Sequence, residues 1–290
     1  MSGRAAPGLV DMAPGIIAAL SFSITDILLK LLYASGMDVM SLLTVRGVLV
    51  TVFFGIWLKL QPPPVWHSRR QAWVAVGLGV LFAGTMFGLL KSIDMLPVSV
   101  AILAYFIYPL LTGIGGALTG LDRLGWRAAV AALAAFGGLA LMLGVNLHNL
   151  SLAGLGFAFG AAVCRVFNLL GTRAYLMGTD ARVTMWYALL PSTAIYIAAS
   201  AAIGVVNFPL GAVGWWSFIG ISIGSTLSSL LIYISTNRVG PFRTAFVMNL
   251  EPLVTAILSM WLLEEYMTPM QMLGAAIMIG ALCAFQFARR

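Results

Sequence analysis

The sequence predicts an all-α integral membrane protein with ten transmembrane helices, and three observations lead to this fold class. Of the 290 residues, 61% are hydrophobic and 9% are charged, whereas soluble domains carry about 25% charged residues. Apolar runs of roughly 20 residues, long enough to cross a bilayer, recur along the whole chain. Basic residues gather in alternate connecting segments, as expected when they fix the orientation of successive helices.

The expected helices follow one another through short connections that are rich in Pro, Gly and charge. Each boundary is placed where an apolar run meets such a connection. The first run is expected to remain as a helix rather than to be removed as a leader. In chain order, the expected spans are 14–33, 40–60, 72–91, 97–118, 126–145, 152–172, 183–206, 214–236, 242–263 and 269–287.

The distribution of charge orients these helices. Placing the N-terminus in the cytoplasm assigns twelve of the 16 basic residues to the cytoplasmic side. A wrong helix count would mix the two sides, so the pattern supports ten helices with both termini cytoplasmic. The opposite loops keep one basic and four acidic residues: Lys91, Asp38, Asp94, Glu264 and Glu265. The cytoplasmic basic residues are Arg4, Lys59, Arg69, Arg70, Arg123, Arg127, Arg173, Arg182, Arg238, Arg243, Arg289 and Arg290.

An internal repeat divides the chain into two halves of five helices each. The stretch that holds Pro97 and Pro109 resembles the stretch that holds Pro241 and Pro252, with one proline at the start of an apolar run and one inside it. An odd number of helices per half predicts an inverted repeat, with a site near the bilayer midplane between the halves. Proline-punctuated helices are also common in membranes without any repeat. The two halves are residues 1–146 and 151–290.

The polar residues exclude several classes of protein. Cys164 and Cys283 both lie in apolar runs, so neither a disulfide framework nor a metal site or other cofactor is expected. The net charge of +7 comes from scattered basic residues rather than a patch, so no nucleic-acid partner is expected. His67 and His148 lie in loops on opposite sides, and no convergent catalytic motif or phosphate-binding loop occurs.

The two proline-containing blocks resemble those of a known family. Pro-Val-Ser-Val-Ala-Ile-Leu-Ala-Tyr-Phe-Ile-Tyr-Pro-Leu-Leu-Thr (97–112) is echoed by Phe-Arg-Thr-Ala-Phe-Val-Met-Asn-Leu-Glu-Pro-Leu-Val-Thr (242–255) and by Leu-Leu-Glu-Glu (262–265). These blocks resemble the EamA family of the drug/metabolite transporter superfamily over essentially the whole chain, and most closely its bacterial inner-membrane exporters of aromatic and other amino acids. The resemblance implies a central cavity lined by the first four helices of each half, with 126–145 and 269–287 at the periphery.

Ionisable side chains inside the expected spans are candidates for a substrate pathway, since each costs roughly 2.5 to 3.5 kcal/mol to insert. Asp26 and Lys30 lie one turn apart and form, with Ser23 and Tyr33, a polar stripe on the first helix. That stripe either lines the cavity or ties helices together through a structural ion pair. Arg46 lies at a depth close to Lys30, where the two cations could hold a carboxylate, unless Arg46 reaches the outer headgroups instead.

The second half adds a further group of candidates. Arg165 and Asn168 share one face of the sixth helix, and Glu251 lies at a similar depth on the ninth. A pair between Arg165 and Glu251 would lower the cost of burying both, whereas an unpaired Glu251 could carry a proton. Ser229 and Tyr233 share a face of the eighth helix, where they either line the cavity or mediate close packing.

Prolines, aromatic residues and one amide complete the candidate site. Prolines inside a helix weaken its hydrogen bonding, so they can act as hinges or present carbonyls to a cavity. Aromatic rings near these prolines could stack on a planar substrate, although such rings also serve packing. The prolines are Pro109, Pro191 and Pro252, the rings are Tyr105, Tyr108, Trp186 and Tyr187, and the amide is Asn249 in the block 242–255.

These features predict a bacterial inner-membrane exporter of aromatic and other neutral amino acids that works by alternating access through a central cavity. The alternative is a transporter of another small metabolite or drug, such as a nucleobase, a sugar-type or a cationic compound. A channel or an intramembrane enzyme is disfavoured. Small residues spaced four apart on 126–145 and 269–287 fit either packing inside the fold or a homodimer; they are Ala134 with Gly138, Ala140 with Gly144, and Ala276 with Gly280.

Overall fold

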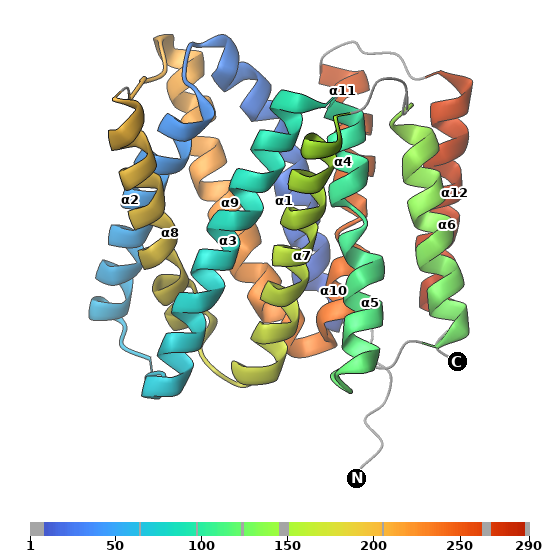
Figure 1. Cartoon of the computed structure of the whole chain (residues 1–290), viewed down its shortest axis with the longest axis horizontal. Coiled ribbons are helices and arrows are strands. Elements are labelled where there is room, and N and C mark those ends of the chain that lie inside the picture. The colour runs from blue at the N-terminus through green and yellow to red at the C-terminus, as the bar shows by residue number, and fades with distance from the viewer. Residues whose placement is uncertain are drawn as a thin grey trace.

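The computed structural model describes residues 9–63, 65–96, 98–122, 125–144, 151–204, 206–262 and 268–287. Within these ranges the regular structure is helical throughout and contains no strand, which confirms the predicted all-α class (Figure 1). The helices are α1 (Leu9–Ala34), α2 (Val39–Leu60), α3 (Arg69–Met95), α4 (Val98–Tyr105), α5 (Tyr108–Leu118), α6 (Trp126–Met142), α7 (Leu152–Tyr175), α8 (Ala181–Ile203), α9 (Gly211–Val239), α10 (Pro241–Val247), α11 (Leu250–Leu262) and α12 (Pro269–Phe287).

Several helices begin at polar residues that satisfy their first backbone N–H groups. Asp38 caps α2 by accepting a hydrogen bond from the backbone N–H of Ser41 at 3.0 Å. Ser68 and Gln71 form a reciprocal capping box at the start of α3, and Asp180 caps α8. Because each cap sits where an apolar run meets a polar connection, local chemistry and hydropathy place these boundaries together.

The helices have the lengths and composition of a multi-pass membrane protein. In the part of the chain that the structure describes, eight helical stretches are long and apolar enough to cross a membrane. Two shorter apolar helices, Trp126–Met142 and Pro269–Phe285, follow the fourth and the eighth of these stretches. Many large apolar side chains of the outer surface are exposed, among them Leu49, Val52 and Phe53 of α2, as suits a surface in contact with lipid. The order matches the predicted one, while the exact count of ten spans stays a prediction.

Two predicted spans are not continuous helices. The stretch 97–118 is divided into α4 and α5, and the stretch 242–263 into α10 and α11, so the helices are interrupted near two of the prolines that the sequence analysis selected as hinges. Each break lies within one turn before a proline, Pro109 or Pro252. Proline lacks an N–H and its ring clashes with the carbonyl four residues earlier, which ends the preceding helix. In contrast, α8 continues through Pro191.

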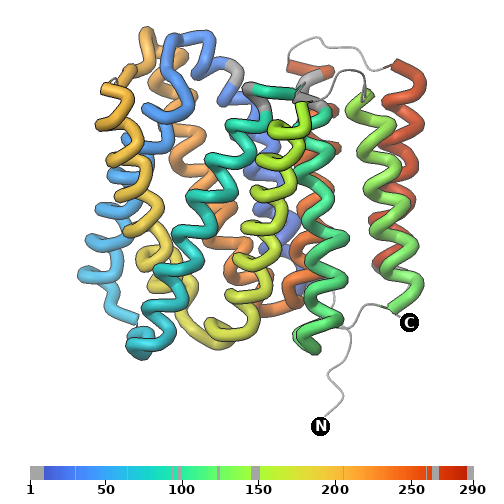
Figure 2. Tube along the Cα trace, viewed as in Figure 1, coloured from blue at the N-terminus to red at the C-terminus, as the bar shows by residue number. Residues whose placement is uncertain are grey.

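The two halves of the chain interlock. Successive stretches alternate in direction, with α4 and α5 forming one stretch and α10 and α11 another, and α1 begins at the end of the bundle where α12 finishes, drawn as the lower end in Figures 1 and 2. The first helix of each half packs along the third helix of the other half: α1 along α9, and α7 along α3. Helices α2 and α8 contact each other, as do α6 and α12. These four contacts therefore stay the same when the halves are exchanged.

Glycines allow the closest approaches between these helices. A methyl group built on Gly79 of α3 would lie 2.0 Å from the carbonyl oxygen of Ala188 on α8. A methyl on Gly138 of α6 would lie 2.7 Å from the carbonyl oxygen of Gly274 on α12. Gly138 is therefore used for packing inside the chain, whereas Gly280 has open space around its Cα. A homodimer through the outer faces of α6 and α12 stays a prediction.

Candidate functional site

Two overlapping hollows lie between α2, α3, α7, α8 and α9, so both halves of the chain contribute to their walls. Each encloses about 340 Å³ of space that no protein atom fills, part of which is open to the surroundings. Because the two hollows have lining residues in common, we treat them as one cavity with two ends, named after Arg165 and Arg46. The shared residues are Phe82, Met185, Leu189, Ser192 and Ser229.

The Arg165 end is built from α7 and α9. Arg165 lines the hollow yet is only 8% exposed, and its guanidinium lies 5.8 Å from the centre of the Tyr108 ring. It interacts electrostatically with Tyr105, Tyr108, Glu251 and Tyr233. Its Nε atom is buried without a hydrogen-bond partner in the described part of the chain. A guanidinium has five N–H donors, so this end keeps a donor for a ligand.

Asn168 and Tyr233 complete the Arg165 end. The side-chain amide of Asn168 donates a hydrogen bond to the carbonyl oxygen of Leu78 at 3.0 Å, which ties α7 to α3. Both Asn168 and Tyr233 are buried and line the same hollow as Arg165. The predicted stripes Arg165–Asn168 and Ser229–Tyr233 therefore face one space.

The acidic candidates lie behind Arg165 rather than in the wall of the cavity. Ser23 donates a hydrogen bond to the backbone carbonyl of Glu251 at 2.9 Å, and Thr255 donates one to Asp26 Oδ2 at 2.9 Å. Glu251 occupies the first turn of α11, where the positive end of the helix dipole favours a carboxylate. Glu251 and Asp26 also interact with each other. Among the described residues, no direct ion pair joins Glu251 to Arg165.

The Arg46 end is lined by hydroxyl groups. Arg46 Nη1 donates to Ser225 Oγ at 2.5 Å, and Ser225 donates its own proton to the carbonyl of Ile221. The Tyr196 hydroxyl lies in the same wall, buried without a partner in the described part of the chain. A hydrogen bond of 2.9 Å joins Thr51 to another lining residue, Thr193.

The remaining candidates lie elsewhere. Tyr105 and Tyr108 are buried in the core behind Arg165, and Trp186 packs beside Gly55. The ring of Tyr187 stacks on His67, with 5.8 Å between centres. Asn249 lies in the break between α10 and α11 and donates to the carbonyl of Phe246 at 2.9 Å. The side chain of Lys30 lies outside the described residues, so its pairing with Asp26 or Arg46 stays a prediction.

The cavity also uses residues that the sequence analysis did not select. Met185, Leu189, Ser192 and Tyr196 follow one another along a single face of α8 and supply much of the wall. Their spacing of three or four residues was a usable signal. Phe82 on α3 carried none, because one aromatic residue in an apolar helix is ordinary packing.

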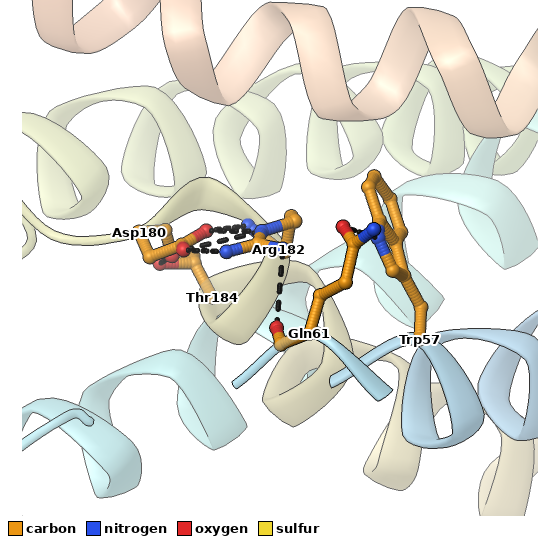
Figure 3. Close-up of polar contacts among 5 residues, drawn as sticks. All are labelled: Trp57, Gln61, Asp180, Arg182 and Thr184. Carbon is orange, nitrogen blue, oxygen red and sulfur yellow. Dashed lines mark hydrogen bonds and ion pairs between the residues drawn. The ribbon is translucent and has the colours of Figure 1, made fainter. Parts of the chain in front are cut away.

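A polar cluster joins the end of α2 to the start of α8 (Figure 3). Arg182 forms an ion pair with Asp180 at 2.6 Å, donates to the carbonyl of Gln61 at 3.3 Å and stacks on the Trp57 ring. His67 Nε2 lies 2.8 Å from Thr184 Oγ1. These contacts join the end of α2 in the first half to the start of α8 in the second.

Two groups in this cluster have shifted pKa values. Burial lowers the pKa of His67, although the nearby Asp180 carboxylate acts in the opposite direction. Burial alone would raise the pKa of Asp180, but hydrogen bonds from the side chain and backbone of Arg182 hold it below its ordinary value.

An apolar helical bundle with a polar cavity shared by two interlocked halves has the architecture of a membrane transport protein. A model of the EamA-like transporter family matches residues 12–144 and 152–285. The chain belongs to the EamA-like transporter family, which confirms the predicted resemblance.

Individual relatives agree with this assignment. The chain is 25% identical over 266 residues to the threonine/homoserine exporter RhtA of Escherichia coli (strain K12), covering 89% of this chain and 84% of that protein. It is also 25% identical over 272 residues to RhtA of Salmonella typhimurium (strain LT2), covering 89% of this chain and 84% of that protein. A solved crystal structure superimposes with a TM-score of 0.82 at 16% identity, covering 96% of this chain and 99% of the other, which shows a shared fold.

Proposed function

We infer that this transporter exports amino acids, or closely related small metabolites that carry a carboxylate, by alternating access through the cavity between its halves. The observation that carries this proposal is the Arg165 guanidinium, which lines the cavity and keeps an unused donor. Guanidinium is the side-chain group best suited to bind a carboxylate through two parallel hydrogen bonds. The similarity to threonine/homoserine exporters favours the same class of substrate.

The proposal includes the finer points of the topology. The halves 1–146 and 151–290 form an inverted repeat in the bacterial inner membrane with both termini in the cytoplasm. The opposite directions of α1 and α7 in Figure 1 support the inversion. None of the four aromatic candidates lines the two described hollows, so the proposal does not depend on ring stacking with an aromatic substrate.

The test is uptake of radiolabelled amino acids by proteoliposomes that contain the purified protein, with and without an imposed pH gradient. Saturable uptake that is lost in Arg165→Gln and kept in Arg70→Gln supports the proposal. Arg70 is exposed, so this matched control makes the same charge change outside the cavity. Absence of uptake for every amino acid, or equal rates in Arg165→Gln and the wild type, contradicts it.

A further inference from the structure

The charged residues of the cavity wall all have one sign. Among the described residues that line the two hollows are two arginines, Arg46 and Arg165, and no Asp, Glu or His. A single carboxylate bound at Arg165 would leave the second guanidinium without an opposite charge. Burying an unpaired cation away from water is costly, so such a residue in a membrane protein points to a function.

Arg46 has no acidic partner of its own in the described part of the chain. Its hydrogen bond goes to the neutral hydroxyl of Ser225, and its electrostatic neighbour is the phenol of Tyr196. The Ser225 proton is already used in the bond to Ile221. Ser225 thus compensates Arg46 only as a dipole, and among the described residues no other hydrogen-bond acceptor contacts the remaining N–H donors of Arg46.

Tyr196 gives a second, independent indication that this end of the cavity binds a ligand. Its side chain is only 4% exposed, its hydroxyl has no hydrogen-bond partner in the described structure, and it lines the same hollow as Arg46. A buried hydroxyl without a partner is uncommon in proteins because its desolvation is not repaid by a hydrogen bond. A ligand that accepts hydrogen bonds from Arg46 and Tyr196 together would satisfy both groups.

The distance between the Arg46 end and the Arg165 end of the cavity limits the kind of ligand that can contact both. Ser225 contacts the Arg46 hollow, Tyr233 the Arg165 hollow, and Ser229 both. Ser225 and Tyr233 are two turns apart on α9, which corresponds to about 12 Å at 1.5 Å per residue. Arg165 lines one hollow, Arg46 lines the other, and Ser229 lies where the two hollows overlap, so a ligand that contacts both arginines must span the cavity with an acidic group at each end.

We propose that Arg46 and Tyr196 form a second anion site, so that the substrate carries two acidic groups, as an acidic amino acid or a short dicarboxylate does. This inference rests on the proposed function and narrows it. One carboxylate binds Arg165, and the second binds Arg46 and Tyr196. An α-ammonium group lies between them, where Ser192 still has acceptor lone pairs because its proton is given to backbone carbonyls of α8.

The experiment compares acidic with neutral substrates in the full-length protein. Proteoliposomes are loaded with labelled glutamate, aspartate, succinate or threonine, and efflux is measured for the wild type, Arg46→Gln, Arg46→Lys and Arg70→Gln. We expect the wild type to prefer the three acidic compounds. Arg46→Gln should raise the KM for them about tenfold or more, with a smaller change for threonine, because it removes a charge-assisted hydrogen bond made only to the second acidic group. Arg46→Lys should recover part of the preference, and Arg70→Gln should behave as the wild type.

Ligand-induced thermal stabilisation of the purified protein provides a readout that does not need transport. Succinate and glutamate should raise the unfolding temperature of the wild type but not of Arg46→Gln. A wild-type preference for threonine, or an equal loss for acidic and neutral substrates in Arg46→Gln, overturns the second site and leaves the proposed function standing. If none of the four compounds is bound or transported, the second site is overturned, and the proposed function is then decided by the uptake test with the other amino acids.

Discussion

The two arginines of the cavity lie in opposite electrostatic surroundings. Arg165 has Glu251 behind it and aromatic rings around it, whereas Arg46 meets only hydroxyl groups among the described residues. A cation with a carboxylate nearby is stabilised by the protein itself, but one surrounded by neutral dipoles depends on what else enters the site. The comparison distinguishes Arg165, which contributes to both folding and ligand binding, from Arg46, which contributes to ligand binding alone.

The largest effect is expected at Arg165. Changing Arg165 to Gln leaves the half-buried Glu251 without its nearby cation, which should cost about 1–3 kcal/mol of folding stability and abolish transport. Unfolding of the purified protein in detergent, followed by intrinsic fluorescence, measures the loss. The double variant Arg165→Gln/Glu251→Gln should regain much of the stability but none of the transport. If both variants are equally unstable, Glu251 does not compensate Arg165.

Arg46→Gln should behave differently in the same unfolding measurement. Since no described carboxylate is left behind, we expect the stability in the absence of substrate to change by no more than about 1 kcal/mol, or to rise. Ser225 keeps its hydrogen bond to the backbone. A destabilisation as large as that of Arg165→Gln would show that Arg46 is a structural residue, and would remove the contrast.

Tyr196→Phe is a finer test of the Arg46 end. The change removes a hydroxyl that has no protein partner, so the stability should be preserved or slightly increased. Efflux of acidic substrates should fall a few-fold, because one hydrogen bond to the bound carboxylate is lost. Tyr187→Phe, which alters a hydroxyl at the His67 cluster outside the cavity wall, serves as the matched control. Equal efflux in both variants contradicts the role given to Tyr196.

The smallest effect concerns how the two ends of the bundle respond to pH. Because burial lowers the pKa of His67, its contribution to stability is complete above its ordinary pKa of 6.5 and is lost as the pH falls below that value. Burial alone would raise the pKa of Asp38 at the upper end, but hydrogen bonds, led by the Ser41 side chain, hold it below its ordinary value, so Asp38 stays ionised.

Hydrogen exchange at pH 7.5 and 5.5, corrected for the intrinsic rate, checks this difference. The lower loop with His67 should exchange faster at pH 5.5, and the upper connection with Asp38 should not change. His67→Gln should remove the pH response of the lower loop. Faster exchange at both ends at pH 5.5 would mean that a titrating group other than His67 controls the exchange.

The sequence predicted the framework of the molecule better than the wall of its cavity. Membrane-crossing helices follow from apolar runs because lipid leaves a buried backbone few alternatives. The depth of Arg46 and Arg165 in the membrane could be predicted for the same reason, because charged residues without a function are excluded from membrane spans. Pro109 and Pro252 indicated kinks, but where each helix stops depends on the tertiary contacts of the preceding turn.

The sequence pattern did not show which helices pack against each other. Ser192 and Tyr196 line the cavity only because α8 turns that face toward α2 and α9, and a stripe of hydroxyl groups would serve helix packing equally well. Matching depth placed Glu251 near Arg165, but hydropathy could not show that the break between α10 and α11 puts Glu251 in the first turn of a new helix.

The contact between Gly138 and Gly274 links the order of synthesis to the completion of the fold. The ribosome synthesises α6 well before α12. Until α12 is inserted, the glycine-bearing face of α6 is exposed to lipid or to insertion factors. The earlier helices also need the second half, because α1 packs along α9. A nascent chain that stops before Pro269 therefore leaves an unpaired helix surface, which is a feature that membrane quality control can recognise.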